Sequence, residues 1–416
     1  MTLDRRKLYQ LPWTPTDNPG GWVQITDVQD IACPGCDHLK PAGHVPLAQV
    51  EADVLTLKRL TNCDHVAIAG GEPLLYPRLL EVVEFIARQG LKPMLLTHGE
   101  RLTHQLAREL RDAGLAMIQF HVDCGMQRPG WTGKNEGELN ELRQQLADLV
   151  WNAGDGGGGP DGRGGRVECG FRITVYRSSL PYLPRVLEWA RANLPKVRHV
   201  ALVAYRAVPI ADAWGYQVGG RTVDASDLPQ ATTDPDRLTV TSERMYEELQ
   251  QHDWRFQAAA YLPGTAAPHT TKFLVAVQLG ARSRLLGYLG PRALEAAQTA
   301  HHFLKGRYAD FPRSAPVGRK ALLLAAVDPA ARAAFKGFLG AAVRDPRRLF
   351  DPVWTQTISI QQPLEFVDAT ANECSGCPEL TVWQGGLIPS CRLDEYRWFG
   401  GPMVPVRGAR ARVGVG

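Results

Sequence analysis

Two groups of cysteines have the spacing of metal ligands. Cys33 and Cys36 form one C-x2-C pair, Cys374 and Cys377 form a second, and Cys391 follows soon after it. Thiolates at this spacing bind zinc or an iron–sulfur cluster. The chain has 416 residues and eight cysteines, so metal binding in a reducing compartment is favoured over a disulfide framework. The alternative for the C-terminal three is a group of reduced cysteines that holds no metal.

A glycine turn that could bind a ligand follows a short apolar run. Gly70-Gly71-Glu72-Pro73 comes directly after residues 66–69. Two glycines at a strand end let the backbone approach a ligand closely, while Pro73 removes a donor and fixes the turn. The alternative is an ordinary tight turn between a strand and a helix.

The turn and the first cysteine pair together resemble the core of the radical S-adenosylmethionine (SAM) superfamily. In that family a C-x3-C-x2-C loop holds three irons of a [4Fe-4S] cluster, and the fourth iron binds SAM. The resemblance implies that the SAM amino group binds at Gly70–Pro73, with Glu72 holding the turn or contacting the ligand. Cys33 and Cys36 occupy the last two cysteine positions of the loop, and Gln29 occupies the first.

Gln29 leaves the loop one thiolate short. An amide oxygen is a hard and weak donor to iron, so Gln29 cannot simply replace a cysteine. Two cysteines alone would hold a [4Fe-4S] cluster poorly, and whether this loop holds one is therefore open. Other side chains that could supply a third ligand are Cys124 at a strand end, Cys169, Cys63, Asp27 and Asp30. The alternative for Cys63 and Cys169 is burial as small apolar residues.

Polar residues at further strand ends extend the family resemblance. It implies that SAM is also contacted by Thr97, His98, His121, Asp123, Arg172 and Thr174. Arg206 directly follows the sixth predicted strand. The sequence assigns no catalytic residue.

The C-terminal cysteines indicate one branch of the superfamily. Residues 120–131, 138–143 and the final cysteine group resemble archaeal tetraether synthases and class D radical methylases. This resemblance implies an auxiliary [4Fe-4S] cluster, in preference to zinc, at Cys374, Cys377 and Cys391. The sequence does not identify a fourth ligand, for which the candidates are His269, His301 and His302.

These side chains must be positioned by the elements around them. Between residues 20 and 210 short apolar runs alternate with amphipathic stretches, which predicts βα units and a parallel sheet. The predicted strands are Trp22–Thr26, His65–Ala69, Lys92–Thr97, Met117–Val122, Glu168–Val175 and His199–Tyr205. The predicted helices are Leu47–Leu60, Tyr76–Gln89, Leu102–Ala113, Glu136–Asn152 and Pro184–Asn193. Together they predict an α/β fold, a partial (β/α)6 barrel of TIM type, whose chemistry lies at the carboxyl ends of the strands.

Four segments divide the chain in this interpretation. They are an N-terminal segment, 1–19; the barrel, 20–210; a mixed helical extension, 211–365; and a cysteine-rich tail, 366–416. The extension has helical patterns at Thr241–His252, Arg292–Leu304, Arg319–Ala326 and Pro329–Ala342, and one predicted strand, Trp354–Gln362. The glycine-rich segment 154–165 is expected to be a flexible surface loop.

Charge and hydropathy exclude some classes of function. Lys and Arg number 47 against 43 Asp and Glu, and the basic residues are scattered, so nucleic acid is not an expected partner. No window approaches the roughly 20 apolar residues that span a bilayer, and the N-terminus lacks a signal core. We therefore expect a cytoplasmic protein that is not an integral membrane protein.

Three functions are compatible with these patterns. The first is a radical SAM enzyme that generates a 5′-deoxyadenosyl radical to modify a small-molecule or lipid substrate, with a reductase as partner. The second is a SAM-binding protein that has lost the radical cluster, acting non-reductively or as partner of an intact radical SAM paralogue. The third is a metal-stabilised protein of unrelated function, which the strand-end motifs disfavour. The sequence does not identify a substrate.

Overall fold

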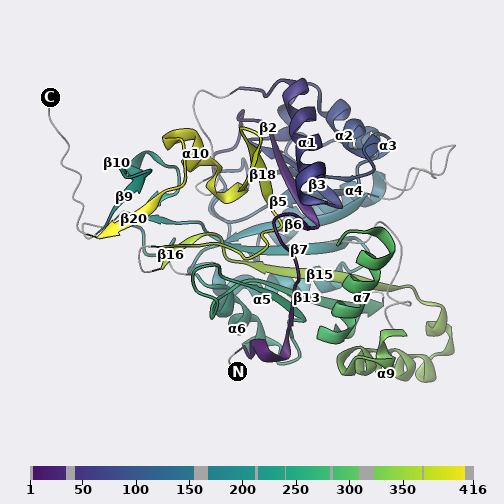
Figure 1. Ribbon diagram of the computed structural model, residues 1–416. Coiled ribbons are helices and arrows are strands. Elements are labelled where there is room, and N and C mark those ends of the chain that lie inside the picture. Colours follow the sequence, from purple (N-terminus) through teal and green to yellow (C-terminus); the bar gives the residue numbers. More distant parts are fainter. Residues whose placement is uncertain are drawn as a thin grey trace, which may run out of the picture.

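The computed structural model describes residues 3–33, 43–153, 167–210, 214–238, 240–281, 284–308, 323–367 and 370–407. Cys36 and the glycine-rich segment 154–165 lie outside these ranges. Figure 1 shows an α/β molecule built on one large twisted sheet with helices packed against it.

Six parallel strands form the first part of the sheet and lie side by side in chain order. They are β2 (Gly20–Thr26), β3 (His65–Gly70), β4 (Lys92–Thr97), β5 (Met117–His121), β6 (Glu168–Val175) and β7 (Val197–Ala204). All six predicted strands are confirmed to within two residues at each end. Every residue of β7 is buried, as expected for a parallel strand covered on both faces.

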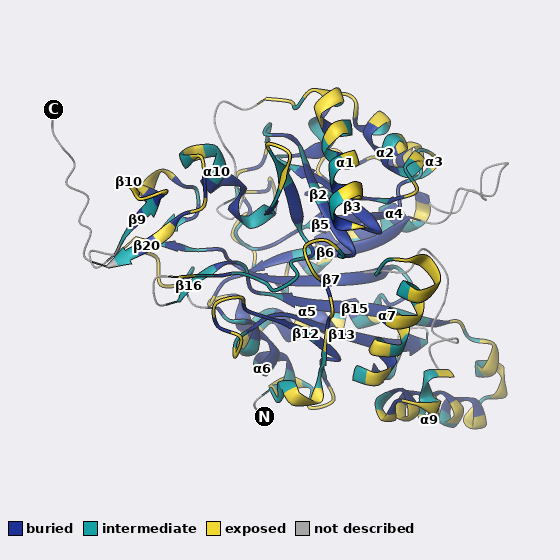
Figure 2. Ribbon diagram, in the orientation of Figure 1, coloured by how far each residue is buried: buried dark blue, intermediate teal, exposed yellow. Residues whose placement is uncertain are grey.

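Helices connect these strands and cover the sheet. They are α1 (Leu47–Thr61), α2 (Leu79–Arg88), α3 (His104–Asp112), α4 (Asn140–Ala153) and α5 (Leu183–Ala192). All five predicted helices are confirmed, with ends that differ by up to four residues. At α3, the Thr103 side chain accepts a hydrogen bond from the Leu106 amide and so caps the helix. Figure 2 shows the buried strands beneath helices whose outer faces are exposed.

The sheet continues beyond β7, through residues that we predicted to be mainly helical. β15 (Val353–Gln361) pairs in parallel with β7, and β13 (Thr271–Ala281) pairs antiparallel with β15. The sheet is completed by β12 (Ala260–Pro263), β14 (Arg284–Leu289) and β1 (Tyr9–Gln10). The strands β12 to β14 were missed because a fully buried strand such as β13 lacks the alternation of apolar and polar residues that marks a strand in a sequence. Closure of the sheet into a barrel remains a prediction.

The helices of this region agree with the sequence in part. α6 (Ser242–His252), α7 (Pro291–Lys305) and α9 (Pro329–Arg344) confirm three predicted helices. The fourth, Arg319–Ala326, begins outside the described residues, and its described part is the short 3-10 helix η5 (Leu323–Ala326). Among the described helices, none is long and apolar enough to cross a membrane.

The C-terminal tail folds back onto the beginning of the sheet. Its hairpin, β18 (Leu380–Trp383) and β19 (Gly386–Pro389), lies against β2 and α1, and α10 (Leu393–Phe399) follows. Figure 1 shows this yellow tail beside the purple β2. The small remaining strands are β8 (Val208–Pro209), β9 (Trp214–Val218), β10 (Arg221–Val223), β11 (Ala231–Thr232), β16 (Glu365–Val367), β17 (Thr370–Asn372) and β20 (Val404–Arg407). The remaining 3-10 helices are η1 (Arg5–Lys7), η2 (Pro73–Leu75), η3 (Leu180–Tyr182), η4 (Ala225–Asp227), η6 (Pro346–Phe350) and η7 (Ser390–Arg392).

Candidate functional site

A cavity of about 200 Å³ lies at the carboxyl edge of the parallel strands. We call it the central cavity. Most of the residues predicted to bind SAM line it: Gly70, Gly71, Glu72, Thr97, His98, His121, Arg172 and Thr174. Pro73 and Asp123 are not in its lining. The strand ends therefore bring together the side chains that the sequence pattern selected.

The glycine turn is packed tightly against the backbone that leads to Cys33. The Gly71 amide donates to the Thr26 carbonyl at 2.8 Å, and the Glu72 amide donates to the Val28 carbonyl at 2.7 Å. A Cβ atom on Gly71 would lie 2.2 Å from the Val28 oxygen. We expected the glycines to admit a ligand, but their closest neighbour is this backbone segment, which no larger residue would allow so near.

Glu72 organises the turn from inside the protein. Its carboxylate is fully buried and accepts hydrogen bonds from the Leu74 amide at 2.9 Å, the Thr97 hydroxyl at 2.5 Å and the His98 amide at 2.9 Å. These donors belong to η2 and to the end of β4. The carboxylate therefore connects η2 with the end of β4.

His98 connects this turn to the segment before Cys33. Its Nδ1 accepts a hydrogen bond from the Glu100 amide at 3.1 Å, so the ring proton resides on Nε2. Nε2 lies 2.8 Å from Asp30 Oδ1 and 3.1 Å from Glu72 Oε2. Asp30 also binds Arg101 at 2.7 Å. The Asp30 carboxylate, considered above as a possible metal ligand, is thus already engaged by two partners.

His121 is a cation in the wall of the central cavity. Its Nε2 lies 2.6 Å from Asp123 Oδ2 and 3.0 Å from the Thr174 hydroxyl. Burial alone would lower the pKa of His121, but the charge and hydrogen bond of Asp123 outweigh it and raise the pKa to about 9. Asp123 stands behind His121 and also accepts the Gly125 and Thr174 amides, which explains its absence from the lining.

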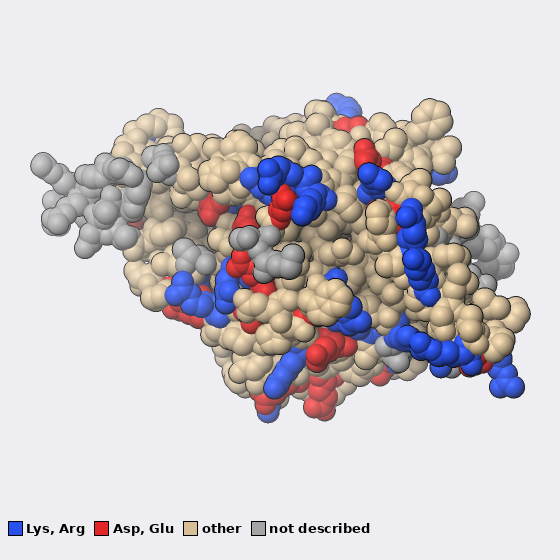
Figure 3. All heavy atoms as spheres, turned by 90° about the horizontal axis from the view of Figure 1, so that it is seen from below, with Lys and Arg blue, Asp and Glu red and all other residues tan. Residues whose placement is uncertain are grey.

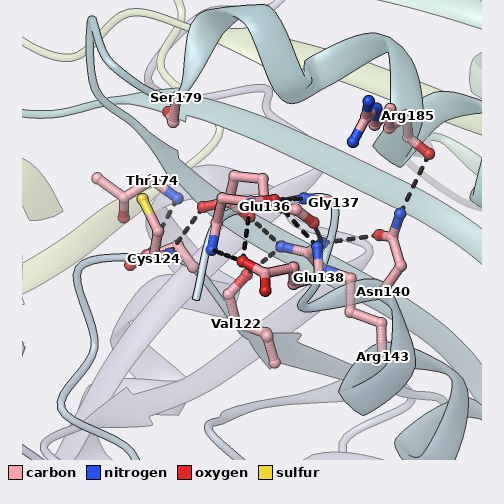
Figure 4. A network of polar contacts seen from close by, with 12 residues as sticks. Val122, Cys124, Glu136, Gly137, Glu138, Asn140, Arg143, Thr174, Ser179 and Arg185 are labelled. Atoms are coloured by element: carbon pink, nitrogen blue, oxygen red, sulfur yellow. Dashed lines mark hydrogen bonds and ion pairs between the residues drawn. The ribbon is translucent and has the colours of Figure 1, made fainter. Parts of the chain in front are cut away.

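A buried ion pair holds the loop after β5. Figure 4 shows Glu136 and Arg143 in direct contact, with Arg143 also donating to the Val122 carbonyl at 2.9 Å. Glu136 accepts the Cys124 amide at 2.7 Å. Burial, together with the negative charges of Glu136 and Asp123, raises the pKa of Cys124, so this thiol is neutral in the absence of metal. No sequence pattern indicated this pair, because charged residues are rarely fully buried.

The first cysteine pair can be located only in part. The Gln127 amide donates to the Ala32 carbonyl at 2.9 Å, which places Cys33 near the loop that carries Cys124. Burial is the main cause that raises the pKa of Tyr176. Cys33 and Cys124 both lie near enough to raise this pKa further. Gln29 lines the central cavity. Cys36 lies outside the described residues.

Two of the suggested replacement thiols lie at the wrong edge of the sheet. Cys63 precedes β3 and Cys169 is the second residue of β6, so both stand at the amino ends of their strands. Both are buried in the hydrophobic core. Of the three thiols considered, only Cys124 follows the carboxyl end of a strand.

The three C-terminal cysteines line one smaller cavity of about 60 Å³, which we call the cysteine cavity. Cys374 and Cys377 precede the hairpin, and Cys391 follows it in η7. Burial raises the pKa of all three thiols. Within the described ranges, no three His, Cys, Asp or Glu side chains are close enough together to form a site for a metal ion.

None of the three candidate histidines lines the cysteine cavity. His301 and His302 both belong to α7. His301 Nδ1 contacts the Arg307 carbonyl at 2.8 Å, and His302 Nε2 contacts Asp17 at 2.8 Å. His269 is exposed in a turn before β13. The fourth ligand of this site remains unassigned.

The two cavities share a wall. Arg172, Glu379, Ser390 and Cys391 line both of them, and Leu393 and Asp394 of α10 line the central cavity. Arg397 of α10 also binds Asp27 at 2.8 Å. The tail thus covers part of the site.

The comparison with protein families agrees with this geometry. The sequence profile described as "Radical SAM superfamily" matches residues 30–136, which include Cys33, the glycine turn and strands β3 to β5. This part of the chain matches the radical SAM superfamily.

Curated relatives share parts of the chain. An "AdoMet-dependent heme synthase" of Oleidesulfovibrio alaskensis is 22% identical over 252 residues, which is 59% of this chain and 55% of the relative. A "GTP 3',8-cyclase" of Synechococcus sp. is 32% identical over 114 residues, which is 24% of this chain and 33% of the relative. The chain thus spans about half, or less, of the length of these relatives.

Solved structures that are similar to part of this chain include the following two. Streptococcus suis SuiB bound to S-adenosylmethionine has a TM-score of 0.35 and 13% identity, covering 46% of this chain and 42% of SuiB. HydG, described as a maturase of the [FeFe]-hydrogenase, has a TM-score of 0.36 and 12% identity, covering 56% of this chain and 48% of HydG.

Proposed function

We propose that this protein binds SAM in the central cavity and uses it, with an iron–sulfur cluster, to generate a 5′-deoxyadenosyl radical that modifies a small-molecule or lipid substrate. The observation that carries the proposal is the junction between the glycine turn and the segment before Cys33. The hydrogen bonds from Gly71 to Thr26 and from Glu72 to Val28 fix the expected SAM-binding turn beside the expected cluster loop. The glycine turn lines the central cavity and lies within the matched region, which begins at residue 30.

The lining of the cavity suits a nucleoside with a charged amino-acid end. Gln24, Gln119 and Thr174 offer polar groups, and Leu96, Met126 and Val203 offer apolar ones. The His121 cation offers a partner for a carboxylate. A ligand with separate polar and apolar parts could therefore be held in one orientation by this chain's own residues.

The chemistry needs one electron from an external reductant, for which we propose a reductase partner. A [4Fe-4S] cluster held at the loop of Cys33 and Cys36 would supply this electron to SAM, and cleavage of the C5′–S bond would give methionine and the radical that removes a hydrogen atom from the substrate. The protein must hold both molecules and exclude water from the radical. The tail residues Ser390, Leu393 and Asp394 are placed to cover the site.

The third ligand of the cluster loop is the open point of this proposal. Cys33 is described, Cys36 is not, and Gln29 is a poor ligand. Cys124 lies nearby, and its thiol proton has an acceptor in Glu136, whose own pKa is raised by burial. We propose Cys124 as the residue that completes the set.

We propose that the cysteine cavity holds an auxiliary [4Fe-4S] cluster in preference to zinc, as the family resemblance implies. Cys374, Cys377 and Cys391 line this cavity together. Burial has the largest effect on the pKa of these thiols. Lys272 lowers the pKa of Cys374 and Arg206 lowers that of Cys391, while the carboxylates Glu373 and Glu379 also line the cavity.

A second function is favoured by Gln29, because it stands where the loop of the family has its first cysteine. If the loop holds no cluster, the same cavity could still bind SAM, for non-reductive use or in a partner of an intact radical SAM paralogue. The four-segment division of the chain, the relation to tetraether synthases and class D methylases, and a cytoplasmic location also remain proposals.

Calorimetric titration with SAM tests the binding site. Gly71→Leu should weaken SAM binding at least about tenfold, because its side chain would displace residues 26–28 and with them the cluster loop. Gly340→Ala is the control, since Gly340 lies in α9 with no atom near its Cβ position. Unchanged affinity in the Gly71 variant would contradict the proposed site.

A further inference from the structure

Helix α9 exposes an apolar stripe that the proposed function does not use. Phe335, Leu339 and Val343 follow one another at four-residue intervals and are 36%, 40% and 83% exposed. At this spacing the three side chains lie on one side of a helix. On the other side Ala334 and Phe338 are buried, and Ala334 packs on Gly287 of β14.

Two exposed residues of η6 extend the apolar stripe. Leu349 is 46% exposed and Phe350 is 82% exposed. η6 packs against α9, so these side chains belong to the same region of the surface. Large apolar side chains grouped in this way on a protein surface mark a binding site.

Basic side chains are interspersed among these apolar ones. Arg332 lies three residues before Phe335 and Lys336 lies three residues before Leu339, so both basic side chains lie near the apolar stripe of α9, and Arg344 and Arg347 follow. In the described part of the chain, none of these four has a carboxylate within ion-pair distance, whereas Arg348 is paired with Asp345 at 3.5 Å. Figure 3 shows blue side chains among tan ones on the right of the molecule, the side where Figure 1 places α9.

We propose that this α9 surface, made of Phe335, Leu339, Val343, Leu349 and Phe350 with Arg332, Lys336, Arg344 and Arg347, binds the surface of an anionic phospholipid membrane. A helix that lies in the membrane interface inserts apolar side chains among the acyl chains, while Lys and Arg contact the phosphates. Both kinds of side chain are present here on one exposed stripe.

The charges favour a membrane over a second copy of this chain. In a symmetric dimer the same surface meets itself, which would bring Arg332 and Lys336 near their own copies. Like charges at an interface oppose association. Anionic headgroups, in contrast, complement every basic residue of the surface.

The α9 surface and the proposed SAM site are separate. Figure 1 shows α9 at the lower right, at the far end of the molecule from α10 and β18, which adjoin the central cavity. Membrane binding would therefore leave the cavity uncovered. Membrane binding by the α9 surface and SAM binding in the central cavity can therefore be tested separately, and either can fail while the other holds.

Vesicle flotation with the full-length chain tests the proposal. Binding is expected to vesicles of phosphatidylcholine with about one third phosphatidylglycerol, and to be much weaker with phosphatidylcholine alone. Arg332→Gln with Lys336→Gln should reduce partitioning by roughly an order of magnitude, and Val343→Glu with Phe350→Glu should abolish it. The circular dichroism spectrum should stay unchanged in every variant, because these side chains are exposed. Arg332 also donates hydrogen bonds to the Ala325 and Ala326 carbonyls of η5 at 3.2 and 3.4 Å, so Lys336→Gln alone is the charge variant whose unfolding midpoint should match the wild type.

Phe303→Glu is the matched control. Phe303 is 87% exposed near the end of α7, which is tied to the end of α1 by the hydrogen bond that Asn62 donates to the Gly306 carbonyl. It should bind vesicles like the wild type. No binding to anionic vesicles, equal loss in the Phe303 variant, or a dimer abolished by Val343→Glu without vesicle binding would each overturn the proposal.

Discussion

Arg172 and Glu379 form a bidentate ion pair, with Nη1 to Oε1 at 2.5 Å and Nη2 to Oε2 at 3.2 Å. Arg172 belongs to β6, and Glu379 follows Cys377 by two positions. Both side chains line both cavities. The pair thus connects the candidate SAM site directly with the loop that carries the C-terminal cysteines.

Breaking this pair should destabilise the junction between sheet and tail. In a double-mutant cycle of Arg172→Met and Glu379→Gln, urea unfolding should give a coupling energy of about 1–2 kcal/mol, because the pair is partly buried and doubly hydrogen-bonded. The exposed pair Arg78 and Glu81 is the control, for which a much smaller coupling is expected because solvent screens it. Equal coupling energies for the two pairs would contradict a connecting role.

Glu72 should contribute to stability through the donors that it satisfies. Glu72→Ala leaves two amides and the Thr97 hydroxyl without their acceptor and should cost about 3–5 kcal/mol of unfolding free energy. Glu81→Gln, on the surface of α2, should leave the unfolding free energy nearly unchanged. A small effect of Glu72→Ala, measured by urea denaturation, would mean that the turn is held by other contacts.

His121 should make stability depend on pH in the alkaline range. Its pKa is about 9 in the folded protein and about 6.5 when unfolded. The Asp123 contact therefore stabilises the fold fully below about pH 6.5, and this contribution is lost as the pH rises through 9. Relative to His121→Gln, the wild type should lose on the order of 2 kcal/mol between these limits. A difference that does not vary with pH would show that His121 is neutral.

The parallel half of the sheet was predictable from the sequence because its signals are local. β4 has the predicted bounds, Lys92–Thr97, since a short apolar run between a helix and a turn has few alternatives. β13 was missed because nothing local distinguishes a buried strand from a buried helix. Its identity depends on pairing with β15, more than seventy residues later.

The difference between local signals and long-range contacts also decides which site residues were predictable. Strand-end residues such as Thr97, His121 and Thr174 could be identified because the carboxyl ends of parallel strands meet at one edge. Glu379 could not, since its partner Arg172 is 207 positions away. Arg397 and Asp27 are separated by 370 positions. Such contacts follow from how the tail packs on the sheet, and no local pattern encodes them.

The C-terminal cysteines should bind iron and couple it to the folding of the tail. After anaerobic reconstitution, the variant with Cys374, Cys377 and Cys391 replaced by Ala should contain about four iron and four sulfide fewer per chain, the content of one [4Fe-4S] cluster. Its tail should also become sensitive to proteases. Cys63→Ala with Cys169→Ala is the control, because both residues lie in the hydrophobic core. Unchanged iron content in the triple variant would exclude this site.

Release of 5′-deoxyadenosine measures the proposed radical formation itself. The reconstituted protein, given dithionite and SAM without oxygen, should release 5′-deoxyadenosine above background, and Cys33→Ala, Cys36→Ala and Cys124→Ala should each abolish the release while Cys169→Ala retains it. Gln29→Cys should raise the occupancy of the cluster in the loop. If the wild type binds SAM but releases no 5′-deoxyadenosine, the protein is not a radical enzyme and the non-reductive alternative holds.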